Sequence, residues 1–418
     1  MAAGTIIIGA GHAGIQAAAS MRLEGYDGPI RVLTDERSLP YHKPPLSKTF
    51  LKQPEPRPQL LRAEGFYTSN NIILERGVRV VEIRPDAHRI RLSCGREEPY
   101  DKLILATGAR PRPLSLPEGG GLQGAQIAAL RTVADAEALR AQIAASRSLV
   151  IVGAGFIGLE LAATLAALGK TVTVTEMSDR VLGRVVAPAV SSHILATLRT
   201  AGVTIHLNSG LSMIGPGREH RHEMRLTGGE RIEADLLVSS IGVEPDTGLA
   251  RAAGLNCDNG ILVDGLMQTS DPDILAIGDC ARFPHQASGR LLRLESVQAA
   301  TDQARTAAAT LCGRIIPYAA LPWFWSDIGD QKLQMAGIST GADQQVLLPA
   351  GQDGAFSVCH FAGSRLLAVD SVNRPADHLL ARKMLNAGFS PRPEDVAANR
   401  LAEAFAAWQS MPAIPADQ

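Results

Sequence analysis

The sequence predicts an α/β protein with two βαβ units and a small α+β domain at its C-terminal end. A short apolar segment, a glycine-rich turn and an alanine-rich segment follow one another at residues 5–23, and the same order returns at residues 148–168. Beyond Trp323, apolar and polar residues alternate, which predicts an antiparallel sheet followed by helices. The 418 residues exceed the roughly 100–200 of one typical domain, so two or three domains are expected.

The first unit begins with residues 5–8, a short β-branched run that predicts a strand buried on both faces. It leads into a G-x-G-x-x-G turn with Gly9, Gly11 and Gly14, and then into a helix expected over residues 15–23. Such glycines allow a tight turn, bring backbone amides close to a pyrophosphate and let helix and strand pack closely. The next strand, at residues 30–33, is followed by Asp35, whose carboxylate can bind ribose hydroxyls. The unit therefore predicts a dinucleotide site.

The second unit repeats this pattern with a strand at residues 148–152, the glycines Gly153, Gly155 and Gly158, and a helix at residues 159–168. A strand over residues 171–175 ends at Glu176. A carboxylate there accepts a hydrogen bond from a free ribose 2′-hydroxyl and repels a 2′-phosphate. The second site is therefore predicted to bind NADH rather than NADPH, so one chain holds two dinucleotides.

Three further strand-to-turn segments extend the duplication. Residues 103–108 and 236–242 each end in a glycine and are followed by a proline, as expected where the chain passes between domains. Residues 269–279 predict another buried strand, whose final aspartate suits a flavin ribityl hydroxyl. The candidate cofactor-binding residues in these turns are Thr107, Gly108, Gly242, Gly278 and Asp279.

Composition excludes several other classes of protein. Forty-one basic against forty-two acidic residues give a net charge of −1, which favours neither nucleic acid nor an anionic membrane as a partner. There is no apolar run of 18 residues, and no basic segment precedes the first strand, so a cytoplasmic protein is expected. Five separated cysteines predict neither a disulfide framework nor a zinc site. The histidines, including His12 and His42, lack ligand spacing, so no metal and no catalytic histidine is expected.

On these residues the chain resembles the two-dinucleotide-binding, glutathione-reductase-like flavoproteins. Within them it is most similar to the FAD-dependent NADH:ferredoxin reductases of bacterial cytochrome P450 and ring-hydroxylating dioxygenase systems, the putidaredoxin reductase type. The resemblance runs from about Thr5 to about Pro375, and its most specific segments are residues 41–48, 278–283, 293–297 and 323–327. It implies an FAD domain over residues 1–112 and 247–322, an NADH domain over 113–246 and a C-terminal domain over 323–418. The alanine-rich tail after Pro391 is expected to fray.

The resemblance also implies roles for individual residues. Lys48 would lie near the redox edge of the flavin, Glu160 beside the nicotinamide, and Trp325 would border the flavin from the C-terminal domain. We hypothesise that Lys48 and Glu160 form an ion pair when the flavin is reduced, because a buried lysine needs an anionic partner to keep its proton. Relatives commonly have glutamine where this chain has Ile328. The residues implied to contact FAD are Ala13, Asp35, Lys48, Val81, Arg131, Asp279 and Val297, and those implied to hold NADH are Gly153, Gly155, Gly158 and Glu176.

The electrons are expected to leave through a one-electron carrier. Disulfide reductases of this architecture need a cysteine pair beside the flavin, but the sequence has no cysteine between Thr5 and Ile90. Cys280 is interpreted as a packed small residue. The implied acceptor is a [2Fe-2S] ferredoxin supplying a monooxygenase or dioxygenase. Its candidate docking patch is the group of basic residues Arg282, Arg290, Arg293 and Arg305, which has few acidic residues among them.

Two alternatives stay open at this point. One is a rubredoxin reductase, with the same chemistry and another acceptor. The other is a slowly turning, NADH-sensing flavoprotein that acts through a partner and forms a long-lived charge-transfer complex.

Overall fold

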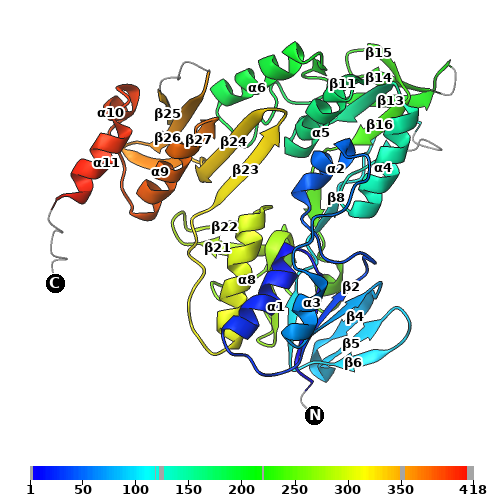
Figure 1. Ribbon diagram of the computed structural model, residues 1–418, viewed down its shortest axis with the longest axis vertical. Helices are drawn as coiled ribbons and strands as arrows, with labels where there is room; N and C mark the ends of the chain where they lie inside the picture. The colour runs from blue at the N-terminus through cyan, green and yellow to red at the C-terminus, as the bar shows by residue number, and fades with distance from the viewer. Residues whose placement is uncertain (1–2, 118, 122–126, 219–220, 349–353, 412–418) are drawn as a thin grey trace. The chain divides into compact units, whose positions relative to one another are not determined.

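The computed structural model describes residues 3–117, 119–121, 127–218, 221–348 and 354–411 (Figure 1). The chain forms two compact units. Unit 1 contains residues 1–113, 129–140 and 242–320, and unit 2 contains residues 114–128, 141–241 and 321–418. No helix of the described residues is long and apolar enough to cross a membrane.

Unit 1 is built on a five-stranded parallel sheet in the order β20-β7-β1-β2-β3. Its central strand β1 (Thr5–Ile8) pairs Thr5 with Ile30 on one side and with Lys102 on the other. All four β1 residues are buried, as their β-branched run predicts. The other strands are β2 (Ile30–Thr34), β3 (Ile72–Arg76), β7 (Lys102–Leu105) and β20 (Ile274–Ala276). The strand expected at residues 269–279 is thus only three residues long, and the chain then enters the 3-10 turn η4 (Gly278–Cys280).

Two alanine-rich helices of unit 1, α1 (His12–Leu23) and α8 (Val297–Leu311), lie side by side in Figure 1. Their contact is close because buried alanines such as Ala17 and Ala304 have small side chains. Ser296 caps α8, since its hydroxyl accepts a hydrogen bond of 3.0 Å from the Ala299 amide. A Cβ built at Gly278 would lie 3.0 Å from the Cβ of Ala13 in α1 and 3.8 Å from that of Ala300 in α8, so the N-terminal part of each helix lies next to this candidate residue.

Smaller elements complete unit 1. The antiparallel sheet β4-β5-β6 and the sheet β18-β19-β21-β22 were not specified by the sequence, and β8 pairs with β17. The strands are β4 (Val80–Arg84), β5 (Arg89–Leu92), β6 (Glu97–Pro99), β8 (Ala109–Pro111), β17 (Val243–Pro245), β18 (Cys257–Asp258), β19 (Gly260–Leu262), β21 (Ala281–His285) and β22 (Arg290–Leu292). The short helices are η1 (Pro44–Ser47), α2 (Thr49–Lys52), α3 (Glu64–Ser69), η2 (Pro85–Ala87) and α7 (Gly248–Ala252). Helix α4 (Val133–Ala145) begins in unit 1 and ends in unit 2.

Unit 2 repeats the parallel sheet in the order β12-β11-β10-β16-β9. Strands β10 (Ser148–Val152) and β11 (Thr171–Thr175) have the predicted bounds, and the helix between them, α5 (Phe156–Ala167), starts three residues before its predicted start. The antiparallel sheet β13-β14-β15 adds a small core centred on Met224. The remaining elements are β9 (Ile127–Ala128), α6 (Pro188–Thr200), β12 (Thr204–His206), β13 (Leu211–Pro216), β14 (His222–Leu226), β15 (Arg231–Ala234) and β16 (Leu236–Ser239).

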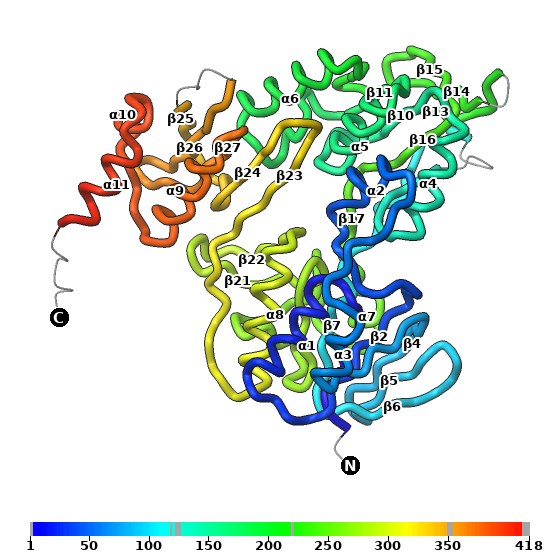
Figure 2. The backbone as a smooth tube through the Cα atoms, viewed as in Figure 1, coloured from blue at the N-terminus to red at the C-terminus, as the bar shows by residue number. Residues whose placement is uncertain are grey.

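The C-terminal part of unit 2 is an antiparallel sheet in the order β23-β24-β27-β26-β25, which can be followed as a tube in Figure 2. The prediction that the tail after Pro391 frays is wrong for most of the tail. Helices α10 (Pro393–Ala397) and α11 (Leu401–Gln409) bury Val396, Leu401 and Phe405 in the core of this sheet, while residues 412–418 lie outside the described part. The other elements are β23 (Trp323–Ile328), β24 (Gln331–Gly337), β25 (Gln344–Leu348), β26 (Phe356–Ala362), β27 (Arg365–Val372) and α9 (Pro375–Asn386).

Candidate cofactor sites

The first glycine turn, residues 9–14, has glycines that the backbone itself requires. Gly9 has φ +109°, and a Cβ at Gly9 would lie 2.2 Å from the Ala106 carbonyl oxygen. A Cβ at Gly14 would lie 1.9 Å from the Gly9 carbonyl oxygen. By contrast, a Cβ built at Gly11 would meet no described atom within 4 Å beyond its chain neighbours, so Gly11 borders open space. Two glycines thus serve chain packing, and the third leaves room for a ligand.

In the second glycine turn, residues 153–158, the first and last glycines again serve chain packing and the middle one borders open space. A Cβ at Gly153 would lie 2.4 Å from the Ser240 carbonyl oxygen, and one at Gly158 would lie 2.2 Å from the Gly153 carbonyl oxygen. A Cβ at Gly155 again meets no described atom within 4 Å. The two turns are therefore equivalent in backbone geometry, as the sequence predicts.

Both turns end at a helix N-terminus that suits an anion. Gly11 and Gly155 are the N-cap residues of α1 and α5, and neither helix has a side-chain cap or an acidic residue in its first turn. First-turn N–H groups lack partners within the helix and carry the positive end of its dipole. The open space at Gly11 and Gly155 and these uncapped amides fit the pyrophosphate of a dinucleotide.

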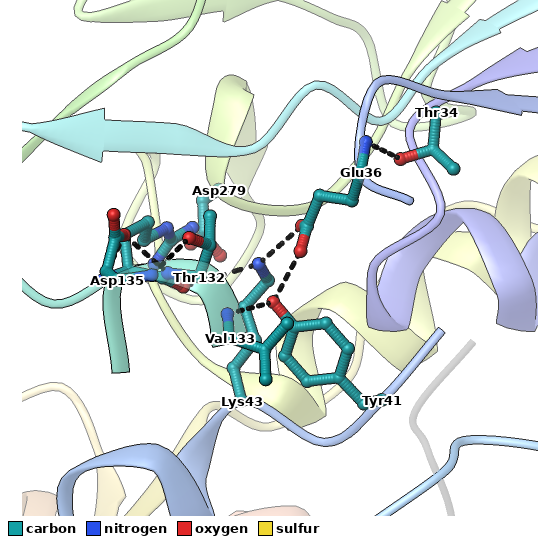
Figure 3. A network of polar contacts seen from close by, with 9 residues as sticks. Thr34, Glu36, Tyr41, Lys43, Thr132, Val133, Asp135 and Asp279 are labelled. Carbon is teal, nitrogen blue, oxygen red and sulfur yellow. Dashed lines mark hydrogen bonds and ion pairs between the residues drawn. The ribbon is translucent and has the colours of Figure 1, made fainter. Parts of the chain in front are cut away.

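A polar network joins predicted FAD residues of unit 1 (Figure 3). Arg131 donates from Nη2 to Oδ2 of Asp279 at 2.9 Å, so the structure brings together two residues implied to contact FAD. Asp135 holds the segment before α4 by accepting from the Arg131 amide at 3.1 Å and the Thr132 amide at 2.8 Å. The guanidinium is half-buried and already oriented beside the Gly278–Asp279 turn.

A second part of this network, around Tyr41, is not predicted from the sequence. The Tyr41 hydroxyl donates to Glu36 at 2.5 Å and accepts from the Val133 amide at 2.8 Å, and the Lys43 ammonium lies 3.1 Å from Glu36 (Figure 3). Burial, and then the Glu36 carboxylate, raise the pKa of Tyr41, which therefore stays protonated. Asp35, the predicted ribose ligand, is exposed. The sequence feature that could have indicated this network is the position of Tyr41 and Lys43 shortly after the acidic residue Glu36, which follows the end of β2.

The remaining unit 1 candidates occupy turns and strand ends. Val81 lies at a register shift in the β4–β5 ladder, between Val80 and Glu82, and is 39% exposed. The Thr107 hydroxyl donates to the Asp246 carbonyl oxygen at 2.7 Å. A Cβ at Gly278 would lie 3.0 Å from the Cβ of Ala13, which places these two candidates side by side. Gly108 and Gly242 have φ of +71° and +97°, and Val297 begins α8.

The NADH candidate Glu176 is held against its own glycine turn. Its carboxylate accepts from the Ala154 amide at 2.8 Å and from the Ser178 amide at 2.8 Å. Arg180 donates hydrogen bonds to the carbonyl oxygens of Val186 and Gly183, so its guanidinium binds the backbone of its own loop. The carboxylate is thus fixed at the end of β11, where a nucleotide ribose is expected.

Different surroundings hold the three residues that the resemblance implies to be catalytic, namely Lys48, Glu160 and Trp325. Lys48 is half-buried between η1 and α2 in unit 1. Glu160 is buried in α5 of unit 2 and accepts a hydrogen bond of 2.7 Å from the buried Ser326 hydroxyl of β23. Trp325 is half-buried in β23, with its ring 5.6 Å from that of Trp323. Ile328 is 1% exposed, so its side chain lies in the interior and not on the surface.

The five cysteines are free. Cys280 is fully buried, and its thiol contacts the carbonyl oxygens of Ile277 at 3.3 Å and Leu105 at 3.5 Å. Burial raises the pKa of this thiol, so the reactive thiolate is disfavoured. This agrees with the interpretation of Cys280 as a packing residue.

The predicted basic patch is largely neutralised. Arg282 pairs with Asp258, Arg293 with Glu295 at 2.7 Å, and Arg305 with Asp302. Arg290 is exposed and has no carboxylate within 4 Å among the described residues. The sequence did not reveal the pairing with Asp258, which lies 24 residues before its partner.

Comparison with known proteins agrees with this geometry. A family model described as pyridine nucleotide-disulphide oxidoreductase matches residues 4–304, and one described as Reductase C-terminal matches residues 323–403. The chain therefore belongs to the pyridine nucleotide-disulphide oxidoreductase family, and it is an FAD-dependent oxidoreductase that uses NAD(H). The predicted family, fold class and cofactors are confirmed.

Particular relatives cover nearly the whole chain. Rhodocoxin reductase of Rhodococcus erythropolis is 43% identical over 94% of this chain and 91% of its own. Rubredoxin-NAD(+) reductase of Pseudomonas putida is 39% identical over 88% of this chain and 96% of its own. The crystal structure of the covalent putidaredoxin reductase–putidaredoxin complex aligns with a TM-score of 0.91 at 38% identity, covering 98% of this chain and 99% of that one.

Proposed function

We propose that the protein is an NADH:ferredoxin reductase, which passes electrons from NADH through FAD to a [2Fe-2S] ferredoxin that supplies a cytochrome P450 or a ring-hydroxylating dioxygenase. The observation that carries the proposal is the combination of two pyrophosphate turns with the absence of any cysteine between Thr5 and Ile90. Bound FAD supplies the chemistry that converts a two-electron hydride into single electrons. Because the proposed donor is NADH, we place the reaction in the cytoplasm.

We assign FAD to unit 1. The first turn would hold the pyrophosphate, and Arg131 and Asp279 would fix the centre of the cofactor, because they form one rigid pair beside Gly278. The bulged backbone at Val81 leaves an edge without a ladder partner, which suits contact with adenine. The corresponding domain boundaries are residues 1–112 and 247–322. The remaining proposed contacts are Gly9, Gly11, Ala13, Gly14, Asp35, Lys48, Thr107, Gly108, Gly242 and Val297.

We assign NADH to the second turn, within residues 113–246. Gly155 borders the open space for the pyrophosphate, and Glu176 would accept from the adenosine ribose 2′-hydroxyl. Glu160 would position the nicotinamide, with Ser326 holding its carboxylate in place. Hydride transfer needs alignment of two rings and no acid or base, so these residues position and do not transfer protons.

Lys48 and Glu160 are proposed to pair when the flavin carries negative charge, and Trp325 is proposed to border the flavin. The burial of Glu160 supports the pairing, because a buried carboxylate is stabilised in its ionised form by a cation. Replacing Lys48 by methionine removes the ammonium and keeps the side-chain length. An unchanged rate of flavin reduction by NADH in this variant would contradict the role of Lys48.

The acceptor can be tested by NADH-driven cytochrome c reduction with the purified protein, alone and with added [2Fe-2S] ferredoxins or a rubredoxin. Strong stimulation by a ferredoxin is expected. Stimulation by rubredoxin alone would favour the second candidate, rubredoxin reduction, which the 39% identity to a rubredoxin reductase supports. If NADH bleaches the flavin but no carrier stimulates turnover, the carrier proposal fails and an NADH-sensing role replaces it.

The ferredoxin is proposed to dock near the β21–β22 hairpin, where Arg290 is exposed. Arg282, Arg293 and Arg305 are expected to contribute less than their charges suggest, because each already pairs with a carboxylate. A small acidic partner would still meet the unpaired charge of Arg290.

A further inference from the structure

Two histidines without a role so far contact each other beside the first turn. Nε2 of His12 lies 3.2 Å from Nδ1 of His42, and the ring centroids are 5.2 Å apart in an edge-to-face arrangement. His12 is the first residue of α1, directly after Gly11. One facing nitrogen must donate and the other accept, so the pair can take up one extra proton but not two while this bond persists.

The charges around the pair are mostly positive. Burial, and then the neighbouring His42, Lys43 and Arg131, together lower the pKa of His12 to about 4. Burial and Arg62 likewise lower the pKa of His42. The neighbouring carboxylates already form ion pairs with other residues, because Glu36 pairs with Lys43 and Asp279 pairs with Arg131. Without an added anion the pair is therefore neutral near pH 7.

Solvent can reach the outer member of the pair. His42 is half-buried and lines a cavity of about 240 Å³ with residues of η1, α2 and the segment 57–59. A proton can therefore reach the pair from water through His42.

We propose that the His12–His42 pair is a proton-coupled part of the FAD site, which takes up one proton from solvent when the FAD pyrophosphate binds at the first turn. The pyrophosphate brings two negative charges to the N-terminus of α1, where His12 is the first residue. These charges oppose Lys43 and Arg131 and favour the protonated pair, which would then hold the cofactor by charge as well as by backbone amides. The inference rests on FAD binding in unit 1 and not on the identity of the acceptor.

Linkage makes the proposal measurable. A group whose pKa rises on binding adds a proton to the complex, so the affinity for FAD increases as the pH falls between the two pKa values. Calorimetric titration of FAD into the deflavinated full-length protein at about pH 6, in two buffers with different ionisation enthalpies, counts the protons. We expect uptake approaching one proton per FAD. Between the pKa values of the free and the FAD-bound pair, the Kd for FAD should decrease by up to about tenfold for each unit by which the pH is lowered.

Matched variants locate the proton. His12→Gln and His42→Gln keep a hydrogen-bonding side chain but cannot titrate near neutral pH, so each should abolish the uptake and flatten the pH dependence of Kd. His88→Gln, at an exposed histidine after η2, is the control and should behave like the wild type. No proton uptake by the wild type between about pH 5.5 and 7.5 would overturn the proposal, as would unchanged uptake in both pair variants. The number of protons that the wild-type protein takes up per FAD tests the proposal by itself, so the test does not depend on whether both variants fold. The carrier assay does not depend on this count, so either proposal can fail alone.

Discussion

The two glycine turns have the same backbone and different surroundings. In each, the first and last glycines pack against a carbonyl oxygen, and the middle glycine borders open space. Around the first turn lie the His12–His42 pair, Lys43 and Arg131, whereas at the second turn the Glu176 carboxylate binds the Ala154 amide. The glycines of both turns thus follow from how the chain packs, and we expect the flanking charges to determine which nucleotide each turn binds.

The largest expected effect comes from removing a packing glycine. A methyl group at Gly14 would meet the Gly9 carbonyl oxygen at 1.9 Å, and one at Gly158 would meet the Gly153 carbonyl oxygen at 2.2 Å. Backbone cannot move aside cheaply, so Gly14→Ala and Gly158→Ala should each lower the free energy of unfolding by about 3 kcal/mol. Chemical denaturation measures this. Wild-type stability in both variants would show that these glycines do not serve chain packing, and destabilisation of only one variant would contradict the equivalence of the turns.

The second prediction tests the charge at the second turn. Glu176→Gln keeps the side-chain length and removes the charge that repels a 2′-phosphate. The ratio of kcat/KM for NADPH to that for NADH should rise about tenfold, equivalent to about 1.4 kcal/mol. Steady-state kinetics with both nucleotides checks it, with Glu230→Gln, an exposed acid of unit 2, as the control. If the ratio stays constant, Glu176 does not set the preference.

A smaller effect is expected in the network that orders the first site. Tyr41→Phe leaves the Val133 amide and Glu36 without the hydroxyl that joins them, and should cost about 1–2 kcal/mol of stability. Tyr100→Phe is a matched control, because the buried Tyr100 hydroxyl has no hydrogen-bond partner among the described residues. Equal melting shifts for the two variants would contradict a specific role for the network.

The smallest effect concerns docking. Arg290→Glu should raise the KM for ferredoxin by a few-fold at low salt, because an exposed charge contributes mainly to encounter and is screened by ions. Arg305→Gln should do less, since Arg305 already pairs with Asp302. A KM ordered the other way, measured across salt concentrations, would move the docking site away from the β21–β22 hairpin.

The sequence was most informative where backbone geometry determines residue type. Strands β10 and β11 and both glycine turns could be predicted because β-branched runs and glycine spacing act locally. The contacts of Arg131 with Asp279, Arg282 with Asp258 and Glu160 with Ser326 could not, because they join residues 148, 24 and 166 positions apart. His12 and His42 were read as scattered, since their hydrogen bond spans 30 residues and follows no ligand spacing. The prediction for the tail is wrong because its alanine content obscures the buried apolar residues of α11, Leu401 and Phe405.

The central claim is that the two turns hold two different dinucleotides, and one pair of variants tests it most directly. Gly11→Ala and Gly155→Ala place a methyl group in open space, so both proteins should fold with wild-type stability. The measurement is FAD content after purification together with NADH affinity. We predict that Gly11→Ala loses FAD, whereas Gly155→Ala retains FAD and binds NADH at least about tenfold more weakly. Loss of FAD from the Gly155 variant, or full retention of both nucleotides in both variants, would contradict the account.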